Sequence, residues 1–123
     1  MARPQYYDRA GNPISIQTLE HLFREADYRI VKQSRDLGKL VSTVWLGIDH
    51  ASYGPPMIFE TMVFRTDPSS GEVEDATELA CARYSTLVEA LAGHEEMCLA
   101  YIQPLDLMVQ KLKESDASVD DSD

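Results

Sequence analysis

Apolar residues recur with helical spacing early in the chain. Five of them follow Ser15, a residue type that often begins a helix, at intervals of three, three, one and three. They are Ile16, Leu19, Leu22, Phe23 and Ala26. This spacing predicts one amphipathic helix that ends at about the last of them. Before it, Tyr6–Ile14 predicts a small hairpin, whose turn begins at Asp8 and in which Gly11 or Asn12 adopts a positive φ.

The pattern then changes to that of β-strands. Leu40–Asp49 is the strongest strand prediction, because it is rich in β-branched and aromatic residues. Both of its faces are largely apolar, so we expect it to lie in the middle of a sheet and to be covered on both sides. Tyr28–Ser34 and Met57–Phe64 predict two further strands, and Glu78–Tyr84 predicts a short last one. Arg65–Asp75 is polar and predicts a loop.

The last third of the chain predicts a helix. Ser85 or Thr86 is the expected N-cap, and Glu89 has the spacing of a capping box, in which its side chain reaches back to the amide of the cap residue. The apolar stripe that follows consists of Leu87, Leu91, Cys98, Tyr101, Ile102 and Leu105. Pro104 lacks the amide hydrogen that a helix interior requires, so the helix is expected to kink there or to end near Tyr101.

Together these elements predict an α+β fold. We expect an antiparallel sheet of three to four strands packed against two or three helices, with Leu105–Leu112 as a second amphipathic segment after the proline. Residues 1–113 are predicted to form a single domain, since no linker or internal repeat interrupts them. Residues 114–123 carry five acidic residues and no basic one, which predicts a disordered acidic tail.

The composition excludes several classes of protein. The chain has 123 residues and a formal net charge of −10. This excess of acid argues against direct nucleic-acid binding and against docking on an anionic membrane, since both need clustered bases. No stretch approaches the roughly 18–20 apolar residues of a membrane span, and the N-terminus has no apolar core of a signal peptide. We therefore expect a cytoplasmic protein whose two cysteines, Cys81 and Cys98, are reduced thiols.

Asp49, His50 and Glu60 form the first candidate site. Asp49 and His50 lie where the strongest strand enters a loop, a common place for functional side chains, and Glu60 follows in the next predicted strand. Such a cluster transfers protons or holds a metal ion. The alternative is a polar loop whose Asp and His bond to the backbone, while Glu60 pairs with a basic side chain. We favour this alternative, because no nucleophile or second histidine is placed beside the cluster by spacing.

His94 is the second candidate, with Cys98 four positions further along the predicted helix. The two side chains are expected to share a face of the helix. Two ligands do not make a zinc site, and no third is evident, so we predict no metal and no cofactor. The favoured interpretation is a packed helix face on which Gly93 allows close approach.

Three further residues are candidates for contacts with a ligand or a partner. Arg29 and Arg35 flank the first predicted strand and meet a phosphate or an acidic partner if they share a face; pairing with Glu60 or another internal acid is the alternative. Tyr53 lies in the loop after His50, and tyrosine is enriched in protein interfaces. Neither a glycine-rich phosphate loop nor a nucleophile elbow is present in the sequence.

Several segments resemble a group of small proteins encoded by bacteriophages and prophages of actinobacteria. They are Tyr7–Ile14, Val41–His50, Gly54–Phe64, Arg83–Thr86 and Glu89–Glu95. The resemblance includes neither the residues after Pro104 nor the loop at 65–78. It implies a phage product that works in the cytoplasm of an infected bacterium, and it carries over no catalytic residue.

These observations favour a non-enzymatic phage accessory protein. Its function is to bind and modulate a host protein, such as a defence component. We expect the partner to have a basic surface, because the acidic tail and the acidic central region attract one. One alternative is a protein that binds or sequesters a nucleotide-like ligand around His50, Tyr53, Glu60 and either Arg29 or Arg35. Another is an enzyme that uses His50 and Glu60, and a third is a minor component of the virion. The sequence leaves self-association open.

Overall fold

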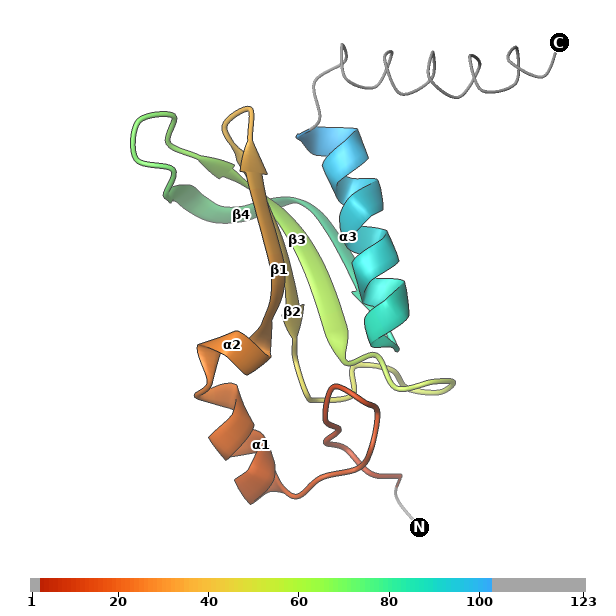
Figure 1. The fold of residues 1–123 in the computed structure, drawn as a ribbon. Coiled ribbons are helices and arrows are strands. Elements are labelled where there is room, and N and C mark those ends of the chain that lie inside the picture. The colour runs from red at the N-terminus through yellow and green to blue at the C-terminus, as the bar shows by residue number, and fades with distance from the viewer. Residues whose placement is uncertain (1–2, 103–123) are drawn as a thin grey trace, which may run out of the picture.

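The computed structural model describes residues 3–102, which form a four-stranded antiparallel sheet and three helices (Figure 1). In chain order the elements are α1 (Ile16–Phe23), α2 (Ala26–Arg29), β1 (Ile30–Asp36), β2 (Lys39–Trp45), β3 (Phe59–Thr66), β4 (Val73–Tyr84) and α3 (Leu87–Tyr101). The strands lie side by side in the order β1-β2-β3-β4, so each pairs with its neighbours along the chain. The predicted α+β fold is confirmed.

The strand with the strongest prediction, β2, is central as expected. It pairs with β1 on one side, where Ser34 lies opposite Val41, and with β3 on the other, where Val41 lies opposite Val63. The antiparallel register places paired residues on the same face, so this row points its side chains toward α3. β2 is shorter than predicted, because Gly47 adopts a positive φ of 76° and turns the chain away from the sheet.

The predicted loop at 65–75 is present but shorter, because both flanking strands extend into it and leave residues 67–72 between them. β3 continues to Thr66, which pairs with Val73 at the start of β4. The turn between them is closed by Asp67, whose carboxylate accepts hydrogen bonds from the amide and hydroxyl of Ser69 at 2.7 and 2.6 Å. Glu74 and Asp75, at the end of the predicted loop, lie instead on the edge strand β4, where charged side chains reach water on the unpaired side.

The first helix is interrupted where one continuous helix was predicted. Ser15 caps α1 as expected, its hydroxyl accepting a bond from the amide of Thr18 at 3.1 Å. α1 ends at Phe23, and Glu25 has an extended backbone before the single turn of α2. The N-terminal hairpin is confirmed, with Tyr7 and Pro13 bridged and Gly11 at a φ of 88°.

α3 begins at the predicted cap and ends at the predicted position. The hydroxyl of Thr86 accepts a bond from the amide of Glu89 at 3.1 Å and donates one to its carboxylate at 2.9 Å. The helix ends at Tyr101. Its buried residues are Ala90, Gly93, His94 and Cys98, whereas Leu91 of the predicted stripe is 39% exposed. Leu105–Leu112 and the acidic tail at 114–123 lie outside the described residues.

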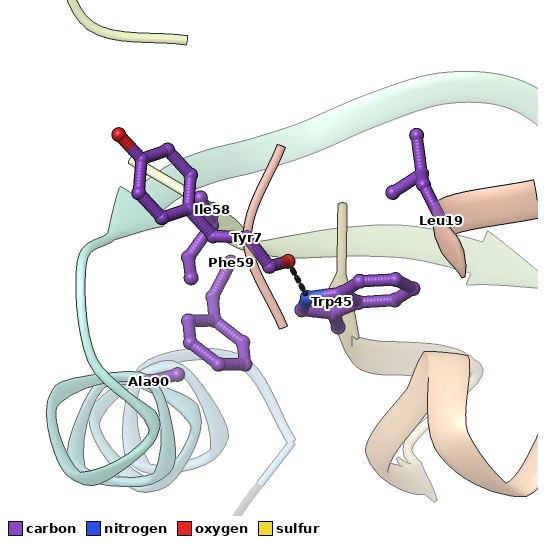
Figure 2. Packing of buried hydrophobic residues seen from close by; sticks show 6 residues of the cluster. All are labelled: Tyr7, Leu19, Trp45, Ile58, Phe59 and Ala90. Carbon is purple, nitrogen blue, oxygen red and sulfur yellow. Dashed lines mark hydrogen bonds between the residues drawn. The ribbon is translucent and has the colours of Figure 1, made fainter. Parts of the chain in front are cut away.

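The largest buried cluster lies where the N-terminal hairpin, α1 and the sheet meet. Its buried members are Tyr7, Leu19, Trp45, Ile58, Phe59 and Ala90. In Figure 2 the indole of Trp45 donates a hydrogen bond of 3.0 Å to the carbonyl of Tyr7, which satisfies its polar atom inside the cluster. A second cluster beneath the end of α3 contains Val41, Val63, Cys98 and Ile102.

One face of the sheet is covered by α3, which lies along it in Figure 1. The other face carries Leu40, Ser42, Val44, Glu60, Met62 and Phe64, and we call it the open face. None of these six residues belongs to either buried cluster. Leu40, Ser42 and Glu60 are nevertheless buried, whereas Val44, Met62 and Phe64 are half-buried. Within residues 3–102, the strongest strand is therefore covered by α3 on one face and only partly covered on the other, so the expected cover on both sides is present only in part.

Candidate functional site

Asp49 holds the loop that follows β2. Its carboxylate accepts hydrogen bonds from the amides of Ala51 at 2.8 Å and Met57 at 3.1 Å, and it pairs with Arg3 at 2.6 Å. Burial alone raises the pKa of Asp49, but the two amide bonds and the charge of Arg3 outweigh it, so the pKa lies below its ordinary value. These contacts give Asp49 a role in loop structure, as the favoured interpretation of the sequence expected.

His50 and Tyr53 lie on the exposed part of this loop. The backbone amide of His50 bonds to the carbonyl of Met57 at 3.1 Å, and Tyr53 is 88% exposed. Among the described residues, no hydrogen bond or ion pair joins His50 to Glu60. The structure therefore does not bring together the proton-transfer or metal-binding cluster that we considered.

Glu60 lies on the open face, near the end of the pairing between β2 and β3. It is on β3 opposite Val44 and Arg83, and its Oε2 accepts a bond from Nε of Arg83 at 2.9 Å. The thiol of Cys81 lies 3.7 Å from the same oxygen. The expected pairing of Glu60 with a base is thus present, and the base is Arg83, which the sequence analysis had not singled out as its partner.

The other two basic candidates lie apart from each other. Arg29, at the end of α2, donates to the carbonyl of Phe23 at 2.6 Å, and its guanidinium lies over the Phe23 ring, 5.3 Å from the ring centroid. Arg35 is exposed on β1 opposite Leu40, so it lies at the margin of the open face. The nucleotide-like ligand pocket requires these residues to converge with His50 and Tyr53, and they are dispersed over separate elements.

His94 is the centre of a buried hydrogen-bond network between α3 and the sheet. Its Nδ1 lies 2.7 Å from Oγ1 of Thr43 on β2, and its Nε2 lies 2.8 Å from Oγ of Ser34 on β1. Thr43 also bonds to Oγ1 of Thr61 at 2.6 Å. The network links four elements, α3, β1, β2 and β3. His94, Thr43 and Thr61 are completely buried within it, and Ser34 is half-buried at its edge.

Gly93 lets the helix approach the sheet beside this network. A Cβ on Gly93 would overlap with the hydroxyl and ring of Tyr84 on β4. The hydroxyl of Tyr84 also takes part in a hydrogen bond with Thr61. Burial raises the pKa of Tyr84. The close approach predicted at Gly93 is therefore present, and it buries Gly93 and His94 beside Cys98 and Ile102 of the predicted stripe. Among the described residues of that stripe, Leu91 alone is exposed.

The hydroxyl of Ser34 and the imidazole of His94 lie within hydrogen-bond distance of each other, as a nucleophile and its base do, but their surroundings favour a structural role. In a catalytic triad an acid orients the histidine from its second nitrogen, whereas here a threonine hydroxyl occupies that position. Burial lowers the pKa of His94, Lys32 adds to the effect, and Glu95 opposes it. The neutral imidazole is thus favoured, and it holds α3 against β1 and β2.

Two cavities with mainly apolar linings lie in the described part of the molecule. A groove of about 340 Å³ lies between α1 and the segment after β2 and is lined mainly by apolar residues, including Leu19, Phe23 and Ile48. A smaller pocket of about 170 Å³ opens on the open face and is lined by Ser42, Val44, Glu60, Met62 and Phe64. Of these two, only the second contains a sequence-predicted site residue, Glu60, whereas Asp49 lines a separate cavity of about 460 Å³ with Arg3 and Ser52.

Ser34, Thr43 and Thr61 were missed by the sequence analysis. The available signal was a polar residue at an inward position of an otherwise apolar strand, which requires a buried partner.

The described residues contain no group of three His, Cys, Asp or Glu side chains placed to hold a metal ion. None of their helices is long and apolar enough to cross a membrane. Comparisons with protein-family models, curated proteins and solved structures found no match.

Proposed function

We propose that this is a non-enzymatic binding protein that docks onto a partner protein through the open face of its sheet. The observation that carries the proposal is the half-buried apolar row of Val44, Met62 and Phe64 in the middle of the two central strands. A sheet normally buries such a row against a second layer. Within the described residues, neither hydrophobic cluster includes it.

The composition of the open face fits a protein interface. Methionine and aromatic residues are enriched at the centre of interfaces, and polar groups are typical of their rims. Here the polar groups of the open face are held in place by hydrogen bonds, with Gln33 donating to Ser42 at 3.1 Å and Arg83 pairing with Glu60 at 2.9 Å. Polar groups that are already oriented lose little conformational freedom on docking.

The charge of the protein indicates the kind of partner. A formal charge of −10 on 123 residues speeds encounter with a basic surface and slows encounter with an acidic one. The partner is therefore a protein with a basic surface. The resemblance to actinobacterial phage proteins makes the cytoplasm of an infected host the place to search for it, and a host defence component belongs among the candidates.

Site-specific photocrosslinking in such a host tests the proposal. A photoreactive phenylalanine replaces Phe64 on the open face in one variant and Val88 in a matched control, since Val88 is 78% exposed on the outer side of α3. We expect a host protein to be crosslinked from position 64 and not from position 88. Its affinity for the purified wild-type protein is then compared with that for Met62→Glu and Val88→Glu, each shown to be folded by circular dichroism.

Met62→Glu should weaken binding of this protein at least about tenfold, because a charge is buried at the centre of the interface, and Val88→Glu should leave it unchanged. Equal affinities for the two variants would refute the open face as the binding surface. Sedimentation tests a second copy as occupant. A wild-type dimer that Met62→Glu dissociates would overturn the proposal, because the face would then serve self-association.

A further inference from the structure

The pocket on the open face has a carboxylate at its base and apolar walls. Glu60 is 8% exposed, and Val44, Met62 and Phe64 form the walls of a space of about 170 Å³. Both hydrogen bonds to Glu60 reach the same oxygen, Oε2, from Arg83 and Cys81. Within residues 3–102, no hydrogen bond reaches Oε1.

The carboxylate of Glu60 has acceptor positions that no described residue fills. An ionised carboxylate has about four of them, and the bonds from Arg83 and Cys81 both reach Oε2. Oε1 lies in the small part of Glu60 that still contacts solvent, and the Arg83 side chain is 47% exposed, so solvent screens the ion pair. A cation that enters the pocket can replace this solvent with a charge-assisted hydrogen bond to Oε1.

We propose that this pocket receives a lysine side chain of the partner protein, with Oε1 of Glu60 as the acceptor of its ammonium group. The inference rests on the proposed function and names one contact within that interface. The apolar walls would pack along the lysine methylenes, as they do where long charged side chains cover apolar surface. Lysine fits better than arginine, because an arginine fork requires two carboxylate oxygens and Arg83 already occupies one.

A peptide titration followed by NMR tests the inference with the full-length protein. The probe is the capped peptide acetyl-Ser-Leu-Lys-Leu-Ser-amide, and the control probe has norleucine in place of lysine. The Met62 methyl signal reports on the pocket. We expect the lysine peptide to shift this signal at lower concentration than the norleucine peptide, and Glu60→Gln to weaken the lysine peptide about tenfold, to the level of the control probe.

Arg83→Gln separates an electrostatic role of Glu60 from a structural one. This variant frees Oε2, so the lysine peptide should bind more tightly than to the wild type, whereas a merely structural Glu60–Arg83 pair would make both variants weaker. Three results would each overturn the lysine pocket. The Met62 signal responds equally to both peptides, it responds to neither peptide, or Glu60→Gln and Arg83→Gln weaken binding of the lysine peptide alike. These outcomes do not decide the proposed function, which depends on crosslinking and on Met62→Glu. A Met62 signal that moves when residues 104–123 are deleted would identify the chain's own segment as the occupant and overturn the inference.

Discussion

Replacing His94 by alanine tests whether the buried network holds α3 on the sheet. The substitution removes the imidazole between Thr43 at 2.7 Å and Ser34 at 2.8 Å. Thr43 keeps its bond to Thr61, so one hydroxyl of the network remains satisfied. Ser34 is only half-buried and regains a partner from water. The cost therefore comes from the lost bonds and from the space left behind.

The expected loss is a large part of the free energy of unfolding. Each of the two hydrogen bonds contributes about 1 kcal/mol, and removal of a completely buried ring adds about 1–2 kcal/mol for the cavity. The sum of about 3–4 kcal/mol compares with a total of about 5–15 kcal/mol for a domain of this kind. At about 4–8 °C per kcal/mol, Tm should fall by more than about 10 °C.

Urea denaturation followed by tryptophan fluorescence measures this loss, because Trp45 is the only tryptophan and is completely buried. Leu99→Ala is the matched control on the same helix, since Leu99 is 39% exposed. We expect the control to lose less than about 0.5–1 kcal/mol. If His94→Ala loses no more than Leu99→Ala, the network does not hold the helix and this account of α3 docking is wrong.

Two further predictions concern the same contact region. Because the pKa of His94 is lowered by burial, the unfolded chain binds a proton at this position below about pH 6.5 before the folded protein does, so stability should fall as the pH drops below that value. The charge of Lys32 strengthens this effect and that of Glu95 weakens it. In chemical denaturation between pH 8 and pH 5, His94→Gln should lose less stability than the wild type. If the free energies of unfolding of the two proteins fall in parallel with pH, His94 is not the group responsible. Gly93→Ala should destabilise by up to about 2 kcal/mol in thermal denaturation, since the overlap with Tyr84 costs about 1–3 kcal/mol and the higher helix propensity of alanine returns about 1 kcal/mol. A stabilised Gly93→Ala protein would show that Tyr84 moves aside freely.

Local signals predicted most of the elements correctly. Ser15 and Thr86 cap helices through bonds to amides three residues ahead, and such contacts depend only on nearby sequence. The apolar residues on both faces of β2 likewise predicted its place in the middle of the sheet. The ends of β3 and β4 were missed, because a charged edge strand and a polar loop have similar composition and only pairing distinguishes them.

The candidate site was predicted less well than the fold. Glu60 and His94 were both singled out, but their partners Arg83, Ser34 and Thr43 are 23, 60 and 51 positions away. Such distances carry no periodicity that a sequence pattern reveals. The two residues also lie on opposite faces of the sheet, which follows from the register of β3 on β2 and from the helix covering one side.

What the sequence by itself determined is the acidic character, the helix caps, the central strand and the exclusion of a phosphate loop, because each depends on composition or on neighbours a few residues apart. The tertiary structure decided which polar residues meet. It buried His94 among hydroxyls by docking α3 at Gly93, and it placed Glu60 in an apolar pocket on the other face. The physical reason is that burial and pairing belong to surfaces brought together from distant segments, and their energies depend on desolvation that only the assembled sheet and helix create.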